Sequence, residues 1–390
     1  MTTYQNTYRY VMTQLYQSGS TPNPIIAELP FTKVNFTQEL NNIGTFQGQL
    51  LLSGIRTNNY NVEQATRPGW AGLYVIHNTD IVWAGVVWSR SYDSRTQTLS
   101  ISAQEIMSYF SRRRITVDKS YTNKDPQYIA ENLLTWAQSI AHGNVGLVVD
   151  NYTASAFSTT RNYNGYEYKG VFQAIKDLSN GCFDFRTYGK VDPTSGNIQP
   201  RLTMGSPTVG KGYSASSSLS VNFMFPGNVV EYVFPEEGLS AANTLYGLGY
   251  GANNARVTAT AIDPDKIQGS GDWPLLEDSV NYLDIADTQL VKDLTKGKCS
   301  AIAYPPTTMQ LVIPTFVDPV YAPNPTWNSA SNYGYMIGDL ARVTIIDDNF
   351  PSGYSDTYTI VAVNVQPGEA GPDRVTVTLT RPLAVNVTVS

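Results

Sequence analysis

Two stretches near opposite ends of the chain repeat one pattern of hydrophobic and polar positions. Residues 73–105 and 341–382 each read as an apolar strand, a turn, a longer apolar strand, a second turn and a closing strand. Both closing strands, Leu99–Gln104 and Val375–Thr380, alternate strictly between apolar and polar side chains, as half-buried β-strands do. The pattern predicts two β modules of similar layout. Such a duplication lets a ring have more repeating units than it has subunits.

Residues 28–115 read as consecutive strands of a β-barrel or small sandwich, and one of these strands is apolar on both faces. Alternation along it gives Ile81, Trp83 and Val87 on one face and Val82, Val86 and Trp88 on the other. One face can fill the interior, and the other then needs a second cover. Val82, Val86 and Trp88 are therefore the candidate interface residues, toward another domain or another subunit.

Three segments between the modules have apolar side chains at helical spacing. They are residues 126–142, about 170–180 and about 279–295. Asp125 followed by Pro126 favours a helix start at the first of them. Gly181 and Gly297 stand where the second and third helices are expected to end.

These elements predict a β-rich α+β fold: two related β-barrel modules with smaller α/β and helical insert domains between them. The expected units are an N-terminal extension (1–27), a first β-barrel (28–115), a small α/β domain (116–210), a second β-barrel (211–235 and 300–390) and a helix-containing insert (236–299). The second barrel is expected to combine two separate parts of the chain, because it has too few strands to close unless the strands of residues 219–234 join it.

The composition indicates a surface suited to packing against other proteins. Charged residues make up 15% of the chain, below the roughly one quarter usual in soluble proteins, and 26 residues are tyrosine. Polar side chains with few rotatable bonds lose little entropy when a partner covers them. The net charge of −6 disfavours binding to a phosphate backbone, which needs clustered Lys and Arg. The basic run Arg112–Arg114 is better explained as a charged end of the first module.

The sequence contains few residues that suggest a catalytic, cofactor-binding or metal-binding site. His77 flanks a hairpin turn and His142 a helix end, and no nucleophile motif accompanies either. Cys182 and Cys299 lack metal-ligand spacing, so both are expected to be buried. The chain has neither an apolar run long enough to cross a membrane nor a secretory signal pattern at its start. We therefore expect no catalytic, cofactor-binding or metal-binding residues, and no cofactor.

Acidic residues give two weak signals for other chemistry. Asp263, Asp265 and Gly269 approach the spacing of a calcium loop. Pro274 stands where a closing glutamate is needed, so a turn is the better interpretation. The pairs Glu236–Glu237 and Asp347–Asp348 are the only residues that suggest a cell-wall hydrolase, which uses two carboxyl groups. Acidic residues beside turns are common without any catalytic role.

Aromatic side chains keep a second function open. Trp70, Trp273 and Trp327 suit either stacking on sugar rings or anchoring a subunit interface, and the low charge of the chain favours the interface. The Asn- and Tyr-rich stretch 151–168 would suit a loop that binds a receptor or a carbohydrate. A receptor- or carbohydrate-binding component is therefore the alternative to a structural role.

The order of strands and turns resembles the tail hub proteins of long-tailed bacteriophages, a group of minor tail proteins related to the baseplate hub of contractile tails. The segments that carry the resemblance are LPFTKVNFTQELNNIGTFQGQLLL (29–52), GLYVIHNTDIVWAGVVWSRSY (72–92), the arginine-bearing Ser111–Ile115, and GDLARVTIIDD (338–348). The resemblance extends from residue 28 to residue 382, and residues 235–325 depart from it.

The resemblance implies a structural, non-enzymatic virion protein. Hubs of this family are homotrimers in which two related barrels per chain alternate around the axis. The resulting pseudo-sixfold ring joins the hexameric tail tube or distal tail ring to a threefold tip. Implied partners are other tail proteins, namely the distal tail ring, tip or spike proteins and the tape measure, with DNA only in passage through the lumen. The implied location is the distal end of the phage tail, after assembly in the host cytoplasm.

Overall fold

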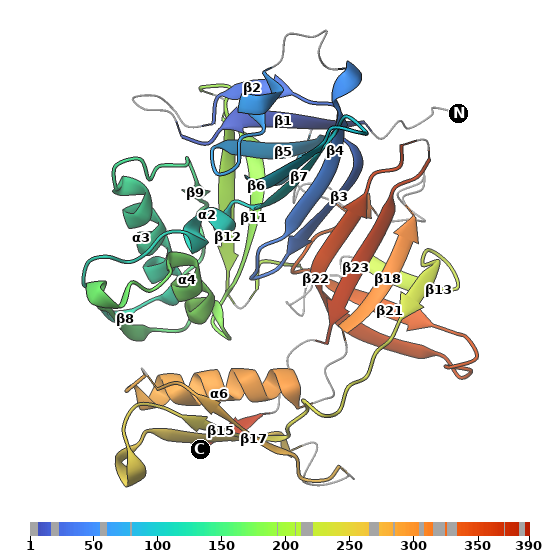
Figure 1. Cartoon of the computed structure of the whole chain (residues 1–390). Coiled ribbons are helices and arrows are strands. Elements are labelled where there is room, and N and C mark those ends of the chain that lie inside the picture. Colours follow the sequence, from blue (N-terminus) through green and yellow to red (C-terminus); the bar gives the residue numbers. More distant parts are fainter. Residues whose placement is uncertain are drawn as a thin grey trace.

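The computed structural model describes residues 7–16, 23–54, 61–78, 80–192, 194–206, 208–211, 221–264, 273–283, 285–303, 308–314, 324–325, 334–369, 371–381 and 387–390. Large, mostly antiparallel sheets dominate these residues, and a few helices gather beside and below them (Figure 1). The predicted β-rich α+β class is confirmed.

The first module is a sheet with strand order β3–β4–β7–β6–β5–β1–β2. Its strands are β1 (Tyr8–Gln14), β2 (Ile25–Glu28), β3 (Thr32–Glu39), β4 (Thr45–Leu51), β5 (Ala71–His77), β6 (Asp80–Asp93) and β7 (Thr98–Glu105). The short η1 (Leu52–Gly54) and α1 (Val62–Ala65) lie between β4 and β5 in the chain. The expected N-terminal extension instead supplies β1, which pairs with β5 over its whole length.

The second module has the strand order β14–β18–β23–β22–β21, and β13 pairs in parallel with β21. Its strands are β13 (Val221–Phe225), β14 (Glu231–Val233), β18 (Thr308–Pro314), β21 (Leu340–Ile345), β22 (Tyr354–Gln366) and β23 (Arg374–Thr380). Strands from residues 221–233 and from 308–380 therefore share one sheet. The chain between them forms a separate unit in the lower part of Figure 1.

The two modules share one strand order. The series β3–β4–β7–β6–β5 corresponds, strand for strand, to β14–β18–β23–β22–β21. A loop glycine with positive φ precedes the first strand of the hairpin in each copy, β5 in one and β21 in the other. The N–H of Gly69 donates to the carbonyl of Val87, and the N–H of Gly338 donates to the carbonyl of Ile360, each at 2.7 Å. Only glycine adopts this backbone conformation at low cost, which explains the residue type in both loops.

A single sheet joins the modules. The first half of β22 pairs with β21, its second half pairs with β3, and β23 lies on its other edge. One apolar cluster accordingly runs through both modules and includes Phe36, Trp83 and Val365. Strand pairs in the described part of the chain form an open path from β14 to β2, so the two expected closed barrels are better described as two modules of a continuous sheet.

The α/β domain packs beside the first module. It contains α2 (Met107–Ser111), α3 (Pro126–Ser139), α4 (Val171–Ser179), the pair β8 (Lys119–Lys124) and β10 (Thr159–Tyr163), the short η2 (Gly165–Glu167), and a sheet of β9 (Val148–Val149), β11 (Asp184–Val191) and β12 (Ile198–Gly205). Asp125 caps α3 by accepting a hydrogen bond from the N–H of Gln127 at 2.7 Å, and Pro126 occupies the first turn, as the sequence predicts.

The lower unit in Figure 1 is a small sheet covered by α6 (Thr288–Ile302). Its strands are β17 (Glu277–Asn281), β15 (Thr244–Leu248), β16 (Thr258–Ile262) and β24 (Thr388–Val389), with η3 (Asn253–Ala255) between β15 and β16. The expected unit boundary at residue 299 falls inside α6. Residues 388–389, expected in the second barrel, pair with β16 instead.

The helix expected over 279–295 is displaced. Residues 277–281 form β17, which runs parallel to β15, and Leu283 is 54% exposed rather than part of an apolar stripe. The helix begins later because the Asp287 side chain accepts a hydrogen bond from the N–H of Leu290 at 3.1 Å. Gly297 lies inside the helix and does not end it. Because Gly297 has no side chain, α6 can lie close to Gly181 in the α/β domain.

Two further short strands, β19 (Asn324–Pro325) and β20 (Gly334–Tyr335), pair in parallel. Among the helices of the described residues, none is both long and apolar enough to span a membrane.

Candidate assembly interface

The candidate residues of β6 are covered by the chain itself. Val82 and Val86 are fully buried, and Trp88 is half-buried. Val86 and Trp88 pack in the apolar cluster of the α/β domain, and the indole of Trp88 donates a hydrogen bond to Ser108 Oγ at 2.7 Å. The described residues of the same chain thus cover these three side chains, and no second subunit is needed to bury them.

Two β-bulges break the alternation on which the prediction rests. The register of β5 with β6 shifts at Val82, and the register of β6 with β7 shifts at Trp88. Each bulge inserts one extra residue, so the side chains beyond it change faces. Val82 therefore joins Trp83 and Val87 in the cluster that runs through both modules, whereas Val86 faces the α/β domain.

The junction between β22 and β3 is held by side chains as well as by the sheet ladder. The N–H of Leu40 donates to the carbonyl of Val361 at 2.8 Å. The amide of Asn364 donates to Asn35 Oδ1 at 2.5 Å and to Thr37 Oγ1 at 2.7 Å. Within the first module, the indole of Trp83 supports β3 by donating to the carbonyl of Thr37 at 3.1 Å. Sequence reasoning missed this junction, because its partners are more than 300 residues apart.

The turn between β22 and β23 contacts the first module. The Tyr8 hydroxyl donates to Asp373 Oδ2 at 2.7 Å, and the N–H of Lys33 donates to Glu369 Oε1 at 3.0 Å. Burial, together with the nearby Asp373 carboxylate, raises the pKa of Tyr8 well above its usual range. The phenol therefore stays protonated and keeps its donor. These contacts fix the two modules at a second place besides the sheet.

Glu105 at the end of β7 is a buried carboxyl between the first module and the α/β domain. It is 2% exposed, and its oxygens accept hydrogen bonds from the Gly44 N–H at 2.7 Å and from Thr187 Oγ1 at 3.2 Å. Burial raises the pKa of Glu105 to about 8, although these hydrogen bonds oppose the shift. Its two hydrogen bonds join Gly44 of the first module to Thr187 of the α/β domain.

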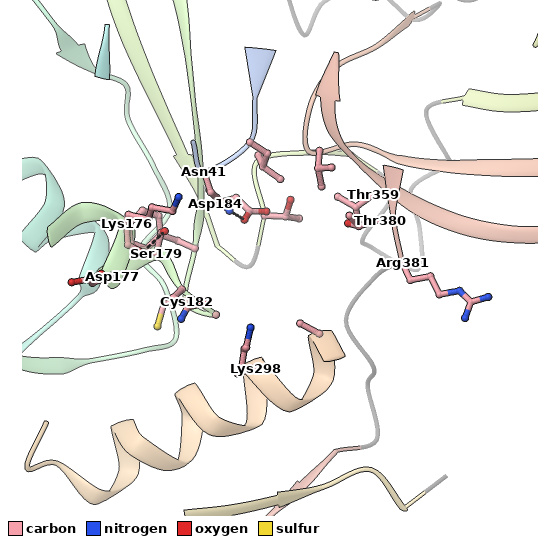
Figure 2. A pocket seen from close by; sticks show the side chains of 18 of the residues that line it. Asn41, Lys176, Asp177, Ser179, Cys182, Asp184, Lys298, Thr359, Thr380 and Arg381 are labelled. Atoms are coloured by element: carbon pink, nitrogen blue, oxygen red, sulfur yellow. Dashed lines mark hydrogen bonds between the residues drawn. The ribbon is translucent and has the colours of Figure 1, made fainter. Parts of the chain in front are cut away.

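A cavity of about 790 Å³ opens where α4, the start of β11, the middle of β22 and α6 meet. Figure 2 shows Lys298 rising from α6 into this space, with Asn41 and Asp184 opposite and Thr359 and Thr380 on the second module. The amide of Asn41 donates to Asp184 Oδ1 at 2.5 Å. Burial raises the pKa of Asp184. The walls are mixed in polarity.

The two histidines lie against tyrosine rings, and the two cysteines are buried. His77 stacks on Tyr8 with ring centroids 4.6 Å apart, and burial lowers its pKa. His142 lies against Tyr16. Burial raises the pKa of the Cys182 and Cys299 thiols to about 11, which disfavours the reactive thiolate. Within the described ranges, no group of three or more His, Cys, Asp or Glu side chains is placed to hold a metal ion.

One residue of each acidic pair accepts hydrogen bonds from neighbouring groups. Glu237 accepts hydrogen bonds from the N–H groups of Leu239 and Ser240, and Asp347 accepts one from the Tyr232 hydroxyl. Among the tryptophans, Trp70 packs against the core and Trp273 is 40% exposed. Trp327, Asp265 and Gly269 lie outside the described residues.

The fold has counterparts among solved structures. A tail protein from Neisseria meningitidis MC58 matches with a TM-score of 0.58 and 12% identity over 96% of both chains. A 43 kDa tail protein of prophage MuSo2 from Shewanella oneidensis matches with a TM-score of 0.57 and 12% identity, over 96% of this chain and 99% of that one. Prophage tail protein gp18 from Listeria monocytogenes EGD-e matches with a TM-score of 0.55 and 14% identity, over 95% and 94%.

No protein-family model and no curated protein matches the sequence. The three structural matches nevertheless span nearly the whole of each chain, so they relate the complete arrangement of modules and insert domains rather than a single common motif. At this level of identity the comparison concerns the fold. The chain has the fold of bacteriophage tail proteins.

Proposed function

We propose that this chain is a non-enzymatic structural subunit of a bacteriophage tail: a homotrimeric hub whose six β modules form a pseudo-sixfold ring. In this role the ring joins the hexameric tail tube or distal tail ring above to a threefold tip below. Other tail proteins are its partners, and DNA only passes through its lumen. Its place is the distal end of the virion tail, after assembly in the host cytoplasm.

The duplication of one strand order within the chain is the observation that carries the proposal. The series β3–β4–β7–β6–β5 recurs as β14–β18–β23–β22–β21, and the two copies are fixed rigidly to each other through β22 and β3. Three such chains supply six similar modules. A threefold ring of this kind presents a nearly sixfold surface, as a connector between hexameric and trimeric structures requires.

The charge balance supports a passage for DNA. The chain carries a net charge of −6 and only 26 Lys and Arg residues in 390. A wall rich in cations would hold DNA by counterion release and would slow its exit. A ring of low positive charge avoids this retention. Fold similarity to prophage tail proteins supports the same assignment.

The oligomeric state tests the proposal directly. Light scattering coupled to size exclusion should give three times the 42.9 kDa mass of one chain, and averaged electron micrographs of the particle should show a ring with six density maxima. A purely monomeric protein at all concentrations up to about 0.1 mM, well above the Kd expected for a stable assembly, would overturn the proposal.

A further inference from the structure

Two strand edges are left open by the described strands. The half of β6 beyond its bulge, Ser89–Asp93, pairs with β7 on one side, and none of the described strands pairs with its other side. β14 and the residues after it, up to Glu237, lie at the end of the sheet next to β18. Ser91, Tyr92 and Asp93 are exposed, as are Pro235, Glu236 and Glu237. Open edges of this kind are templates for pairing with another chain.

We infer that these two edges bind each other between neighbouring subunits: residues Val233–Glu237 of one copy add as an antiparallel strand to Ser89–Asp93 of the next. This inference rests on the proposed ring and names its subunit contact. The template for it is the junction inside the chain, where the second half of β22 receives β3. Because the modules are duplicated, the same junction can be completed once more between chains.

The bulges align β6 with β22 residue by residue. In the first module, Val86 and Val87 pair with Gln104 and Ala103, Trp88 is the extra residue, and Ser89 pairs with Ser102. In the second module, Thr359 and Ile360 pair with Thr380 and Leu379, Val361 is the extra residue, and Ala362 pairs with Thr378. Trp88 therefore corresponds to Val361, and Ser89–Tyr92 correspond to Ala362–Val365. The last four are the residues that receive β3.

The same comparison aligns β14 with β3. Asn35 pairs with Gln47, and Val233 pairs with Gln310. Gln47 and Gln310 occupy equivalent places, since they pair with Ser102 of β7 and Thr378 of β23. Val233 thus corresponds to Asn35, and Phe234–Glu237 correspond to Phe36–Glu39. Carried across to the next subunit, the register places Tyr92 opposite Phe234, Ser91 opposite Pro235, and Arg90 opposite Glu236.

The phase of the hydrogen bonds explains how a proline fits this strand. Leu40 donates its N–H to the carbonyl of Val361, so these two residues form a hydrogen-bonded pair. Hydrogen-bonded and non-hydrogen-bonded pairs alternate along an antiparallel ladder, so Thr37 and Asn364, three residues further along, form a non-hydrogen-bonded pair. Pro235 corresponds to Thr37 and faces the equivalent position beside Ser91. Its missing N–H is therefore not needed by the ladder between subunits.

Side chains at the two edges favour the contact. Val230 and Val233 are 54% and 53% exposed, and Tyr92 is 48% exposed, so each edge offers apolar surface for burial. Phe234 is held in place by edge-to-face contacts with Phe350 and Tyr354. Arg90 already donates to the carbonyl of Glu63 at 2.6 Å and to Thr66 Oγ1 at 3.1 Å, so the contact does not depend on an ion pair with Glu236. The partner that fits both edges is a second copy of this chain, bound head to tail.

Disulfide trapping tests the register. Residues opposite each other at non-hydrogen-bonded positions have Cα atoms about 4.5 Å apart, within reach of a disulfide. The double variant Ser91→Cys, Pro235→Cys should form covalent dimers and trimers on mild oxidation, resolved on a non-reducing gel and reversed by a thiol. A mixture of the two single variants should stop at the dimer. The native Cys182 and Cys299 are buried and give little background.

A displaced pair provides the matched control. Tyr92→Cys with Val230→Cys uses exposed positions on the same two edges, but four residues out of register, and should not cross-link. Equal cross-linking of this control pair would overturn the register. A protein that is trimeric by light scattering but gives no disulfide at Ser91 and Pro235 would overturn the inference and leave the proposed hub intact. A purely monomeric protein would overturn both.

Hydrogen–deuterium exchange of the wild-type protein gives a test that does not depend on the variants folding. In the assembled protein, peptides covering 89–93 and 233–237 should exchange at least tenfold more slowly than in protein diluted until it dissociates. Equal exchange in the two states would overturn the inference.

Discussion

At the scale of single residues, Glu105 makes stability depend on pH. The pKa of its carboxyl in the folded protein is about 8, above the ordinary value of 4.5. Between these two values the folded state binds more protons than the unfolded state. The free energy of unfolding therefore falls as pH rises from about 4.5 to 8 and shows no further loss from this group at higher pH.

The variant Glu105→Gln should be more stable than the wild type above pH 8, by on the order of 1–3 kcal/mol, and should show no such gain at pH 5. Glutamine can still accept from the Gly44 N–H without burying a charge. Thermal unfolding at the two pH values measures the difference. Glu63→Gln, at a side chain that is 82% exposed, is the control and should change stability little at either pH. A destabilised Glu105→Gln variant at pH 9 would contradict this account.

Residue-level prediction from sequence succeeded where the strands are regular and failed at the bulges. The closing strands β7 and β23 alternate between buried and outward side chains along their length, as their sequences predict. On β6, alternation placed Val82 with Val86, but the bulge at Val82 puts these side chains in different clusters. Nothing in the local sequence marks a bulge, because it depends on the register of the paired strand.

At the scale of elements, the same limit applies to α6. Leu283 and Ala286 fit helical spacing, yet β17 pairs with β15 just before them, and tertiary pairing outweighs the local pattern. The sequence did contain a signal for the true start, since Asp287 is a favoured residue for capping a helix. The prediction that Gly297 ends the helix was wrong, because this glycine lies where α6 approaches Gly181 of the α/β domain, a contact that the local sequence does not show.

Substitution of Gly297 should separate helix propensity from interdomain contact. A Cβ at this position would lie 3.5 Å from the Cα of Gly181, an ordinary contact, so Gly297→Ala should raise stability by up to about 1 kcal/mol through helix propensity. The longer side chain of Gly297→Leu reaches past this contact toward Gly181 and the cavity between α6 and the α/β domain, where we expect it to disturb the packing of the two. Hydrogen exchange near residues 180–184 should then increase in the leucine variant only. Faster exchange in both variants, or in neither, would contradict the proposed close contact.

At the scale of the whole molecule, the duplication could be predicted from the sequence, but the way the copies join could not. The repeated strand–turn–strand pattern is local, and it is present at both ends of the chain. The pairing of β22 with β3 joins residues separated by more than 300 positions, and hydrophobic patterning gives no register between such distant strands. This joint is what turns two modules into one rigid unit and leaves an edge open at each side.

The nature of those edges predicts how the assembly responds to salt. The inferred contact consists of backbone hydrogen bonds and apolar side chains, and Arg90, opposite Glu236, is already bound to Glu63 and Thr66 of its own chain. Screening by salt weakens exposed charge pairs but has little effect on the other two contributions. The mass of the assembly, measured by light scattering, should therefore stay constant from about 0.05 M to about 1 M NaCl. Glu236→Gln should leave that mass unchanged as well, whereas dissociation on raising salt would mean that ion pairs, rather than the strand edges, hold the subunits together.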